Sequence, residues 1–443
     1  MKIPGGPLAS MACVFFLLAS CSTPPDKSPN EPTRPNMLVY VVDALRPDSL
    51  GCYGNQEVET NAVDALARDG VLFENAFAQS SWTRPSMATI LTGLYPGAHG
   101  VLGREHRLSP HLTLLPEILR RYGYRTGFIT TNPNVGSVFG FDQGWDMFQE
   151  LYERRDEGRV RSTELITRSD AVTDAAVAWI DRVTQPFFLV ILAVDPHWPY
   201  EPLEPFDRYV PEASGDRERT KGLYQGEVAA NDDAFGQLLA YLNDRNLYDD
   251  TTIVFTSDHG EEFWEHGERG HGRTLYEESI RVPLVIRSLH AGPMTGGRRM
   301  DQPVQSVDIV PTLLTLAGLP LPSPLDGKSI VTPASEASPV FARLLHDSHN
   351  LAAIRDYPWK LIWDRSTEEM LLFNLEEDPG EKTPVTNRHK DVAARLADQL
   401  FEHAARNLDR RESLGESGGS ETVDEETLPD NVRETLKALG YVQ

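Results

Sequence analysis

Residues 37–43 read MLVYVVD, a continuous apolar run that ends in an aspartate. Such a run, bounded by polar residues, is typical of a strand buried on both faces of a parallel sheet. Similar runs occur at 125–130, 187–194, 251–256 and 281–287. Helical patterns lie between them, at 60–69, 85–92, 112–122, 169–183, 222–243 and 307–316. This alternation predicts an α/β fold with a mostly parallel central sheet sandwiched by helices.

A smaller unit is expected after a proline-rich break near residues 320–339. Short strand-like runs at 340–345, 351–355, 359–363 and 370–374 precede a helical pattern at 391–405. We therefore expect a main domain at 36–320 and a small C-terminal antiparallel α+β subdomain at 338–408. Residues 409–443 would be an acidic tail, disordered over the low-complexity stretch 411–428 and ending in a short helix that docks on the body.

The chain of 443 residues carries 66 acidic and 42 basic side chains, a formal charge of -24. Nucleic-acid binding needs clustered Lys and Arg, so this balance argues against a nucleic-acid partner. Hydrophobic residues make up 40% of the chain, which is ample for a core and excludes a wholly disordered protein.

The N-terminus has the form of an export signal. Residues 1–21 contain one Lys and an apolar run at 11–19 that is too short to span a bilayer. The run ends Leu-Ala-Ser-Cys21, which resembles the lipobox of bacterial lipoproteins. We expect a lipidated Cys21, a proline-rich tether at 22–35, and a membrane anchor in the bacterial cell envelope, at its periplasmic face or outer membrane. An ordinary secretion signal with an incidental cysteine is the alternative.

Polar residues follow three of the predicted strands. Asp43, Asp195 and the pair Asp258-His259 each come directly after a strand, or one residue beyond it. Because the carboxyl ends of parallel strands meet at one edge, these side chains should converge there. Two adjacent metal-capable side chains followed by a glycine favour a metal site at Asp258-His259 over helix capping.

A second focus is SSWTRPSM at residues 80–87. Pro85 suits the first turn of a helix, which places Thr83 at its start. Thr83 could simply cap this helix. Alternatively it is a nucleophile or metal ligand where helix N-H groups attract tetrahedral oxyanions.

These stretches, with several others in the same order, resemble the sulfatase family of the alkaline phosphatase superfamily over about residues 37–319. The stretches are VVDALRPDSLGCYG, SSWTRPSMATILTGLYPGAHGV, GFDQGWDMF, DPHWPY, TSDHGEEFWEHG and HGRTLYEESIRVPLVIR, with FNLEEDPGE at 373–381 as a further echo. The resemblance implies an α/β hydrolase that binds one divalent metal ion. Its implied ligands are Asp43, Asp258, His259 and the nucleophile at position 83.

The nucleophile motif departs from that family. Family members begin it with a Cys or Ser that is oxidised to formylglycine and end it with Arg, whereas this chain has Thr83 and Met87. The usual second Asp is Ala44, and Asn132 stands in the region of the usual Lys-x-His. Relatives with one metal and a threonine nucleophile, such as lipoteichoic acid synthase, act on phosphoesters. A metal-activated Thr can attack phosphorus and form a phosphothreonine, so phosphoester or phosphodiester chemistry is favoured.

Alternatives stay open: a true sulfuric ester hydrolase, a transferase, or a non-catalytic glycan-binding lipoprotein. The substrate would be an anionic ester, such as an envelope glycan or a lipid headgroup. The ligand types suit Mn²⁺, Mg²⁺ or Zn²⁺, with Ca²⁺ less favoured because His259 replaces Asn.

The resemblance also suggests residues on the substrate side. His197 would contact the substrate or protonate the leaving group, with packing on its aromatic neighbours as the alternative. His271 could share that role, and Arg273 could neutralise an ester oxygen. Arg84 and Asn132 are the remaining expected substrate contacts.

Overall fold

The computed structural model describes the chain in several stretches. Besides Met1, these are residues 34–152, 168–212, 215–289, 294–332, 338–415 and 421–441. The chain divides into a unit of residues 1–33 and a unit of residues 34–443, and all described helices and strands belong to the second. The expected signal peptide, Cys21 and nearly all of the tether lie outside the described residues. Within the described stretches, no helix is both long and apolar enough to cross a bilayer.

A nine-stranded sheet forms the centre of the second unit, in the order β10-β2-β9-β6-β1-β5-β3-β4, with β11 paired to β2. The strands are β1 (Asn36–Val42), β2 (Val71–Phe77), β3 (Arg125–Thr130), β4 (Met147–Glu150), β5 (Phe187–Ala193), β6 (Thr251–Ser257), β9 (Arg281–Arg287), β10 (Arg298–Met300) and β11 (Val304–Gln305). β1 runs parallel to β5 and β6, whereas β9 is antiparallel to β6 and β2. The predicted mostly parallel sheet is therefore confirmed.

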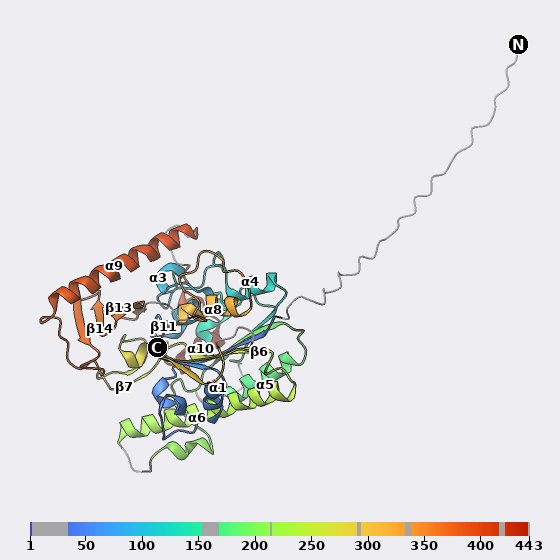
Figure 1. Ribbon diagram of the computed structural model, residues 1–443, viewed down its shortest axis with the longest axis horizontal. Helices are drawn as coiled ribbons and strands as arrows, with labels where there is room; N and C mark the ends of the chain where they lie inside the picture. Colours follow the sequence, from blue (N-terminus) through green and yellow to red (C-terminus); the bar gives the residue numbers. More distant parts are fainter. Residues whose placement is uncertain are drawn as a thin grey trace. The chain divides into compact units, whose positions relative to one another are not determined.

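Both faces of the sheet are covered by helices (Figure 1). α1 (Asn61–Asp69), α5 (Ser169–Ile180) and α6 (Asp216–Asp244) cover one face. The other face meets α2 (Thr83–Thr92), α3 (Pro96–His99), α4 (Leu115–Arg121) and α8 (Ile309–Leu316). Alternate residues of β1 enter opposite cores, as Val41 and Val42 illustrate. This two-sided burial explains why the strand is apolar throughout.

The C-terminal subdomain is an antiparallel sheet of β12 (Val340–His346), β13 (His349–Asp356), β14 (Trp359–Asp364) and β15 (Glu369–Asn374), as predicted. Helix α9 (Lys390–Ser413) packs on it through Leu396 and Leu400. Lys360 of β14 is fully buried and pairs with Glu277 of α7 (Glu277–Ile280) at 3.0 Å and with Glu381 at 2.9 Å. This ion cluster ties the small sheet to the main one.

The acidic tail differs from the prediction. α9 continues to Ser413, and the described residues 421–428 pair with the body instead of being disordered. Val423 N donates to Glu105 O at 2.7 Å, and Arg107 N donates to Glu421 O at 2.9 Å. These contacts run through the backbone, so they leave no apolar signature in the sequence. The predicted terminal helix is present as α10 (Asp430–Ala438), after a 3-10 turn, η8 (Glu425–Thr427).

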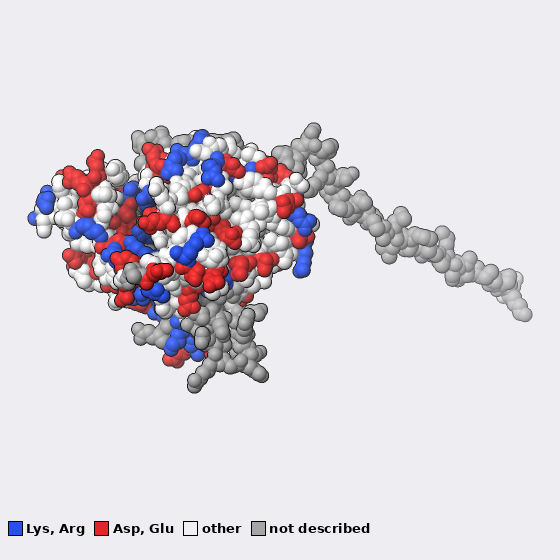
Figure 2. Space-filling model, turned by 90° about the horizontal axis from the view of Figure 1, so that it is seen from below, with Lys and Arg blue, Asp and Glu red and all other residues white. Residues whose placement is uncertain are grey.

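Charged side chains of both signs alternate over the face shown in Figure 2. On that face the negative excess is spread among mixed groups.

Candidate active site

Two neighbouring strands bring the predicted metal ligands together. Val42 of β1 lies beside Ser257 of β6 in a parallel register, so the residues that follow, Asp43 and Asp258, emerge side by side. His259 comes next, and all three functional side chains are fully buried. Convergence at strand carboxyl ends is the rule for open α/β sheets.

The backbone around these residues is tightly held. Ala44 adopts a left-handed conformation with φ 58°, and its N-H donates to Asp258 Oδ1 at 3.2 Å. The Tyr224 hydroxyl donates to Ala44 O at 2.9 Å. A Cβ atom at Gly260 would lie only 2.0 Å from Glu278 O, so the residue after the Asp-His pair has to be glycine. Such strain, held by its surroundings, is characteristic of functional sites.

The donor set fits a divalent cation. His259 Nδ1 donates to Gly260 O at 2.9 Å, which in the neutral ring leaves the lone pair on Nε2. That nitrogen lies 3.5 Å from Asp43 Oδ1 and 3.4 Å from Asp258 Oδ2, and neither oxygen has a hydrogen-bond partner among the described residues. Burial, and then the charge of Asp258, raise the pKa of Asp43 well above its ordinary value. Electron-rich atoms that converge without donors indicate a site for a divalent cation.

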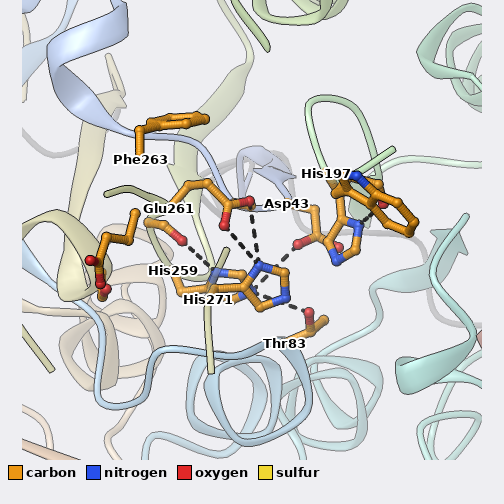
Figure 3. Close-up of polar contacts among 12 residues, drawn as sticks. Asp43, Thr83, His197, His259, Glu261, Phe263 and His271 are labelled. Atoms are coloured by element: carbon orange, nitrogen blue, oxygen red, sulfur yellow. Dashed lines mark hydrogen bonds and ion pairs between the residues drawn. The ribbon is translucent and has the colours of Figure 1, made fainter. Parts of the chain in front are cut away.

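Thr83 lies against this cluster (Figure 3). It is the first residue of α2, and Trp82 is the N-cap, so Thr83 itself does not cap the helix. Its Oγ1 lies 3.3 Å from His259 Nε2 and 3.0 Å from the hydroxyl of Tyr441. The structure thus places Thr83 next to the predicted metal ligands, at the N-terminus of a helix.

His197 and His271 flank the same point, with ring centroids 4.7 Å apart. His197 Nδ1 donates to Trp198 O at 2.5 Å, and His271 Nδ1 faces Glu261 Oε1 at 3.3 Å. Their Nε2 atoms therefore both point at the Tyr441 hydroxyl, at 2.8 and 3.2 Å. Burial lowers the pKa of His197 to about 3 and that of His271 well below its ordinary value, so both rings are neutral acceptors in this arrangement.

The guanidinium of Arg84 turns away from the site. It donates to Asn134 O and Oδ1, to Arg104 O and to His106 O, and it stacks on Phe139 at 3.5 Å. These hydrogen bonds all join the Arg84 guanidinium to other groups of the protein. The geometry therefore assigns Arg84 to holding the loop at residues 104–106 rather than to the predicted substrate contact.

Two more polar residues form hydrogen bonds with neighbouring residues of the protein. Asn132 Nδ2 donates to Asp43 Oδ2 at 2.6 Å, which orients a predicted metal ligand. Asp195 accepts from the N-H and Oγ of Ser169 at 2.9 Å each, at the start of α5. The expected convergence of three strand-end carboxylates thus holds for two of them.

Arg273 stands at the mouth of the site, where it pairs with Glu268 at 2.8 Å while remaining half exposed. It borders a pocket of about 220 Å³ next to the histidines. Other lining residues are His197, Arg269, His271, His346 and Tyr441. Arg269 and Arg273 are the arginines that line this pocket, and Glu261 and Asp347 are its acidic lining residues.

Sequence reasoning missed two residues of the site. Glu261 is fully buried and positions His271, and its nearness to His259 in the chain was a usable signal. Tyr441 comes from the far end of the chain, in a segment expected only to dock on the surface. Nothing in the sequence around Tyr441 points to the site.

Comparisons with known proteins agree with this architecture. The family model described as Sulfatase matches residues 35–319, and the one described as N-sulphoglucosamine sulphohydrolase, C-terminal, matches residues 265–406. An ulvan-active sulfatase of Formosa agariphila is 28% identical over 356 residues, which cover 72% of this chain and 68% of that protein. The chain therefore belongs to the sulfatase family, and it is a hydrolase of that family.

Solved structures share the fold. A phosphonate monoester hydrolase of Agrobacterium radiobacter superposes with a TM-score of 0.73 at 24% identity, covering 85% of this chain and 96% of its own. A protein solved in complex with its substrate D-glucosamine-2-N,6-O-disulfate gives a TM-score of 0.74 at 21% identity, covering 85% and 98%.

Proposed function

We propose that this protein is a metal-dependent hydrolase of phosphoric esters, a phosphomonoesterase or phosphodiesterase, in which Thr83 is the nucleophile. The observation that carries the proposal is the position of Thr83 Oγ1, 3.3 Å from His259 Nε2 and at the N-terminus of α2. Asp43, Asp258, His259 and Thr83 would hold one divalent ion. When bound, such an ion lowers the pKa of the threonine hydroxyl and polarises a substrate oxygen.

The protein's own groups account for the remaining steps. Thr83 Oγ1 forms a bond to phosphorus while the bond to the leaving-group oxygen breaks and its electron pair leaves with that oxygen. The first N-H groups of α2 stabilise the negative charge on the phosphoryl oxygens. His197 or His271, whose Nε2 atoms carry lone pairs, would take the proton of the Thr83 hydroxyl and pass it to the departing oxygen. Water then attacks the phosphothreonine in line, and the phosphorus–Oγ1 bond breaks to restore Thr83.

Threonine disfavours the family's usual sulfate chemistry. A formylglycine hydrate releases sulfate by forming an aldehyde, whereas a sulfated threonine has no such route. Phosphothreonine needs only a second in-line displacement. Similarity to an ulvan-active sulfatase supports sulfuric ester hydrolysis as the second candidate, and similarity to a phosphonate monoester hydrolase supports phosphorus chemistry. An acceptor alcohol in place of water would make the protein a transferase.

The proposal is tested on four aryl esters, namely a sulfate, a phosphate monoester, a phosphate diester and a phosphonate, with Mn²⁺ present. We expect the best kcat/KM on one of the phosphorus esters. Thr83→Ala should lower kcat at least about 10³-fold, while Thr83→Ser, which keeps the hydroxyl, should retain part of the activity. Faster cleavage of the sulfate would favour the second candidate.

Metal analysis addresses the non-catalytic alternative. We expect about one divalent ion per chain in the wild type and a loss of it in His259→Ala. A protein that only binds glycans has no need of a stoichiometric ion at this position.

We also propose that Cys21 carries lipid and anchors the protein in the bacterial cell envelope. Labelling with a radioactive fatty acid, lost in Cys21→Ala, is the direct test.

A further inference from the structure

One oxygen atom of the C-terminal segment engages the three groups that the proposed reaction uses. The Tyr441 hydroxyl lies 3.0 Å from Thr83 Oγ1, 2.8 Å from His197 Nε2 and 3.2 Å from His271 Nε2. The Tyr441 side chain is buried, and Thr83 is fully shielded from solvent beneath it.

This oxygen occupies the place that a substrate needs. A reacting phosphorus atom has to approach the nucleophile to roughly 3–3.5 Å before the bond forms. The Tyr441 oxygen is already 3.0 Å from Thr83 Oγ1. We propose that residues 421–441 form an autoinhibitory strap, which seats the phenol of Tyr441 where the ester group of the substrate binds. This inference rests on the proposed function of Thr83.

The C-terminal end of the strap places the Tyr441 ring in the site. Val432, Leu436 and Leu439 bury the apolar side of α10 and its C-terminus in the main core. Gly440 has φ 79°, a left-handed conformation that favours glycine, and the Tyr441 N-H donates back to Leu436 O at 2.9 Å. The chain thereby reverses direction at the end of the helix and sends the ring into the site.

The start of the strap is held by weaker contacts. Besides two backbone hydrogen bonds and a bridge at Thr422, Arg104 pairs with Glu425 at 3.3 Å and Arg107 with Glu421 at 3.5 Å. These ion pairs are partly exposed, and such pairs are individually weak and sensitive to salt. The same loop receives the guanidinium of Arg84, which neighbours Thr83. Reversible release of the strap is therefore compatible with an intact fold.

The hydrogen bonding favours occlusion over a catalytic role for the phenol. Both histidines present acceptor nitrogens, and the single phenol proton can serve only one of them at a time. To act as an acid, the phenol would need a leaving-group oxygen within hydrogen-bond reach. Its own oxygen fills that space, so the ring has to withdraw before a substrate enters. If the closed form outnumbers the open form tenfold, apparent affinity for an anion falls about tenfold.

The test compares full-length variants by calorimetric binding of inorganic phosphate with Mn²⁺ present, and by kcat/KM on the best aryl ester. Tyr441→Ala removes the ring, and Leu436→Asp detaches α10 without changing the ring. Tyr357→Ala, at a tyrosine that is 57% exposed and remote in sequence from the strap, is the matched control. We expect both strap variants to bind phosphate at least tenfold more tightly, to gain a similar factor in kcat/KM and to remain folded by circular dichroism. The control should match the wild type.

Unchanged phosphate affinity in Tyr441→Ala overturns the strap, as does a fall in kcat/KM, which would make Tyr441 a catalytic residue. Tighter phosphate binding with no hydrolysis of any ester would support the strap and reject the proposed reaction. Failure of the strap proposal and failure of the proposed reaction therefore give different results.

Discussion

Asp43→Asn should make the metal-free protein more stable while abolishing its response to metal. The amide oxygen can keep the hydrogen bond from Asn132, and the amide NH₂ would face the lone pair of His259 Nε2. In the wild type, the ligand atoms of Asp43 and Asp258 lie within 4.8 Å of each other. Two unit charges at that distance repel by about 3 kcal/mol at an effective dielectric constant of about 20. Because the raised pKa of Asp43 lets protonation relieve part of this repulsion, we expect a net gain of ~1–3 kcal/mol.

The stability that Asp43→Asn gains in the absence of metal should increase as the pH rises. Burial and the charge of Asp258 raise the pKa of Asp43 above its ordinary value. A carboxyl whose folded pKa is raised contributes stability that is present below the unfolded pKa, ~3.9, and is lost as pH rises through the folded value. The free energy of unfolding of metal-free Asp43→Asn should therefore exceed that of the metal-free wild type by an amount that increases with pH.

The assay is urea unfolding with EDTA and with Mn²⁺, for wild type and variant. Saturation at about 100 times the dissociation constant should add ~2.7 kcal/mol to the wild type and nothing to Asp43→Asn. A variant that is less stable than the wild type in EDTA, or that still gains stability from Mn²⁺, would refute the assignment of Asp43 as a buried ligand.

Three further predictions concern residues around the site. Lys360→Met leaves the buried Glu381 without its cation and Glu277 with Arg355 alone, and should cost ~3–5 kcal/mol in urea unfolding; a loss below ~1 kcal/mol would contradict the buried ion cluster. Glu261→Gln removes the charge that positions His271, so kcat should fall ~10- to 100-fold with KM nearly unchanged; a change in KM alone would place Glu261 on the substrate side. Arg84→Lys cannot make all four hydrogen bonds and should lose ~1–3 kcal/mol of stability, whereas a large rise in KM without loss of stability would restore its predicted substrate contact.

The buried strands were predictable because two-sided burial leaves an apolar run, as in 37–42. β2 was missed, since its sequence VLFENAF is interrupted by two polar residues, and β10 and β11 are too short to leave a pattern. The helix at Thr83 was recognisable from Pro85, but not that Trp82 rather than Thr83 is its N-cap. Tail residues 421–428 escaped prediction because backbone pairing determines their position.

Within the site, the sequence predicted correctly those residues that directly follow adjacent parallel strands. Asp43 and Asp258 follow adjacent parallel strands, so their meeting follows from the sheet. The sequence could not predict in which direction a side chain points. Arg84 is next to Thr83 in the chain, yet its guanidinium points into a loop. Tyr441 is separated from Thr83 by 358 positions, and only the folded chain reveals their contact.

The identity of the nucleophile is tested most directly by acid-quenching the enzyme during turnover of an aryl phosphodiester and mapping the covalent adduct by mass spectrometry. The account predicts a phosphoryl group, with or without the retained ester substituent, on the peptide that contains Thr83 and on Thr83 itself. Turnover that proceeds with the adduct on another side chain, or undiminished turnover in Thr83→Ala, would contradict it.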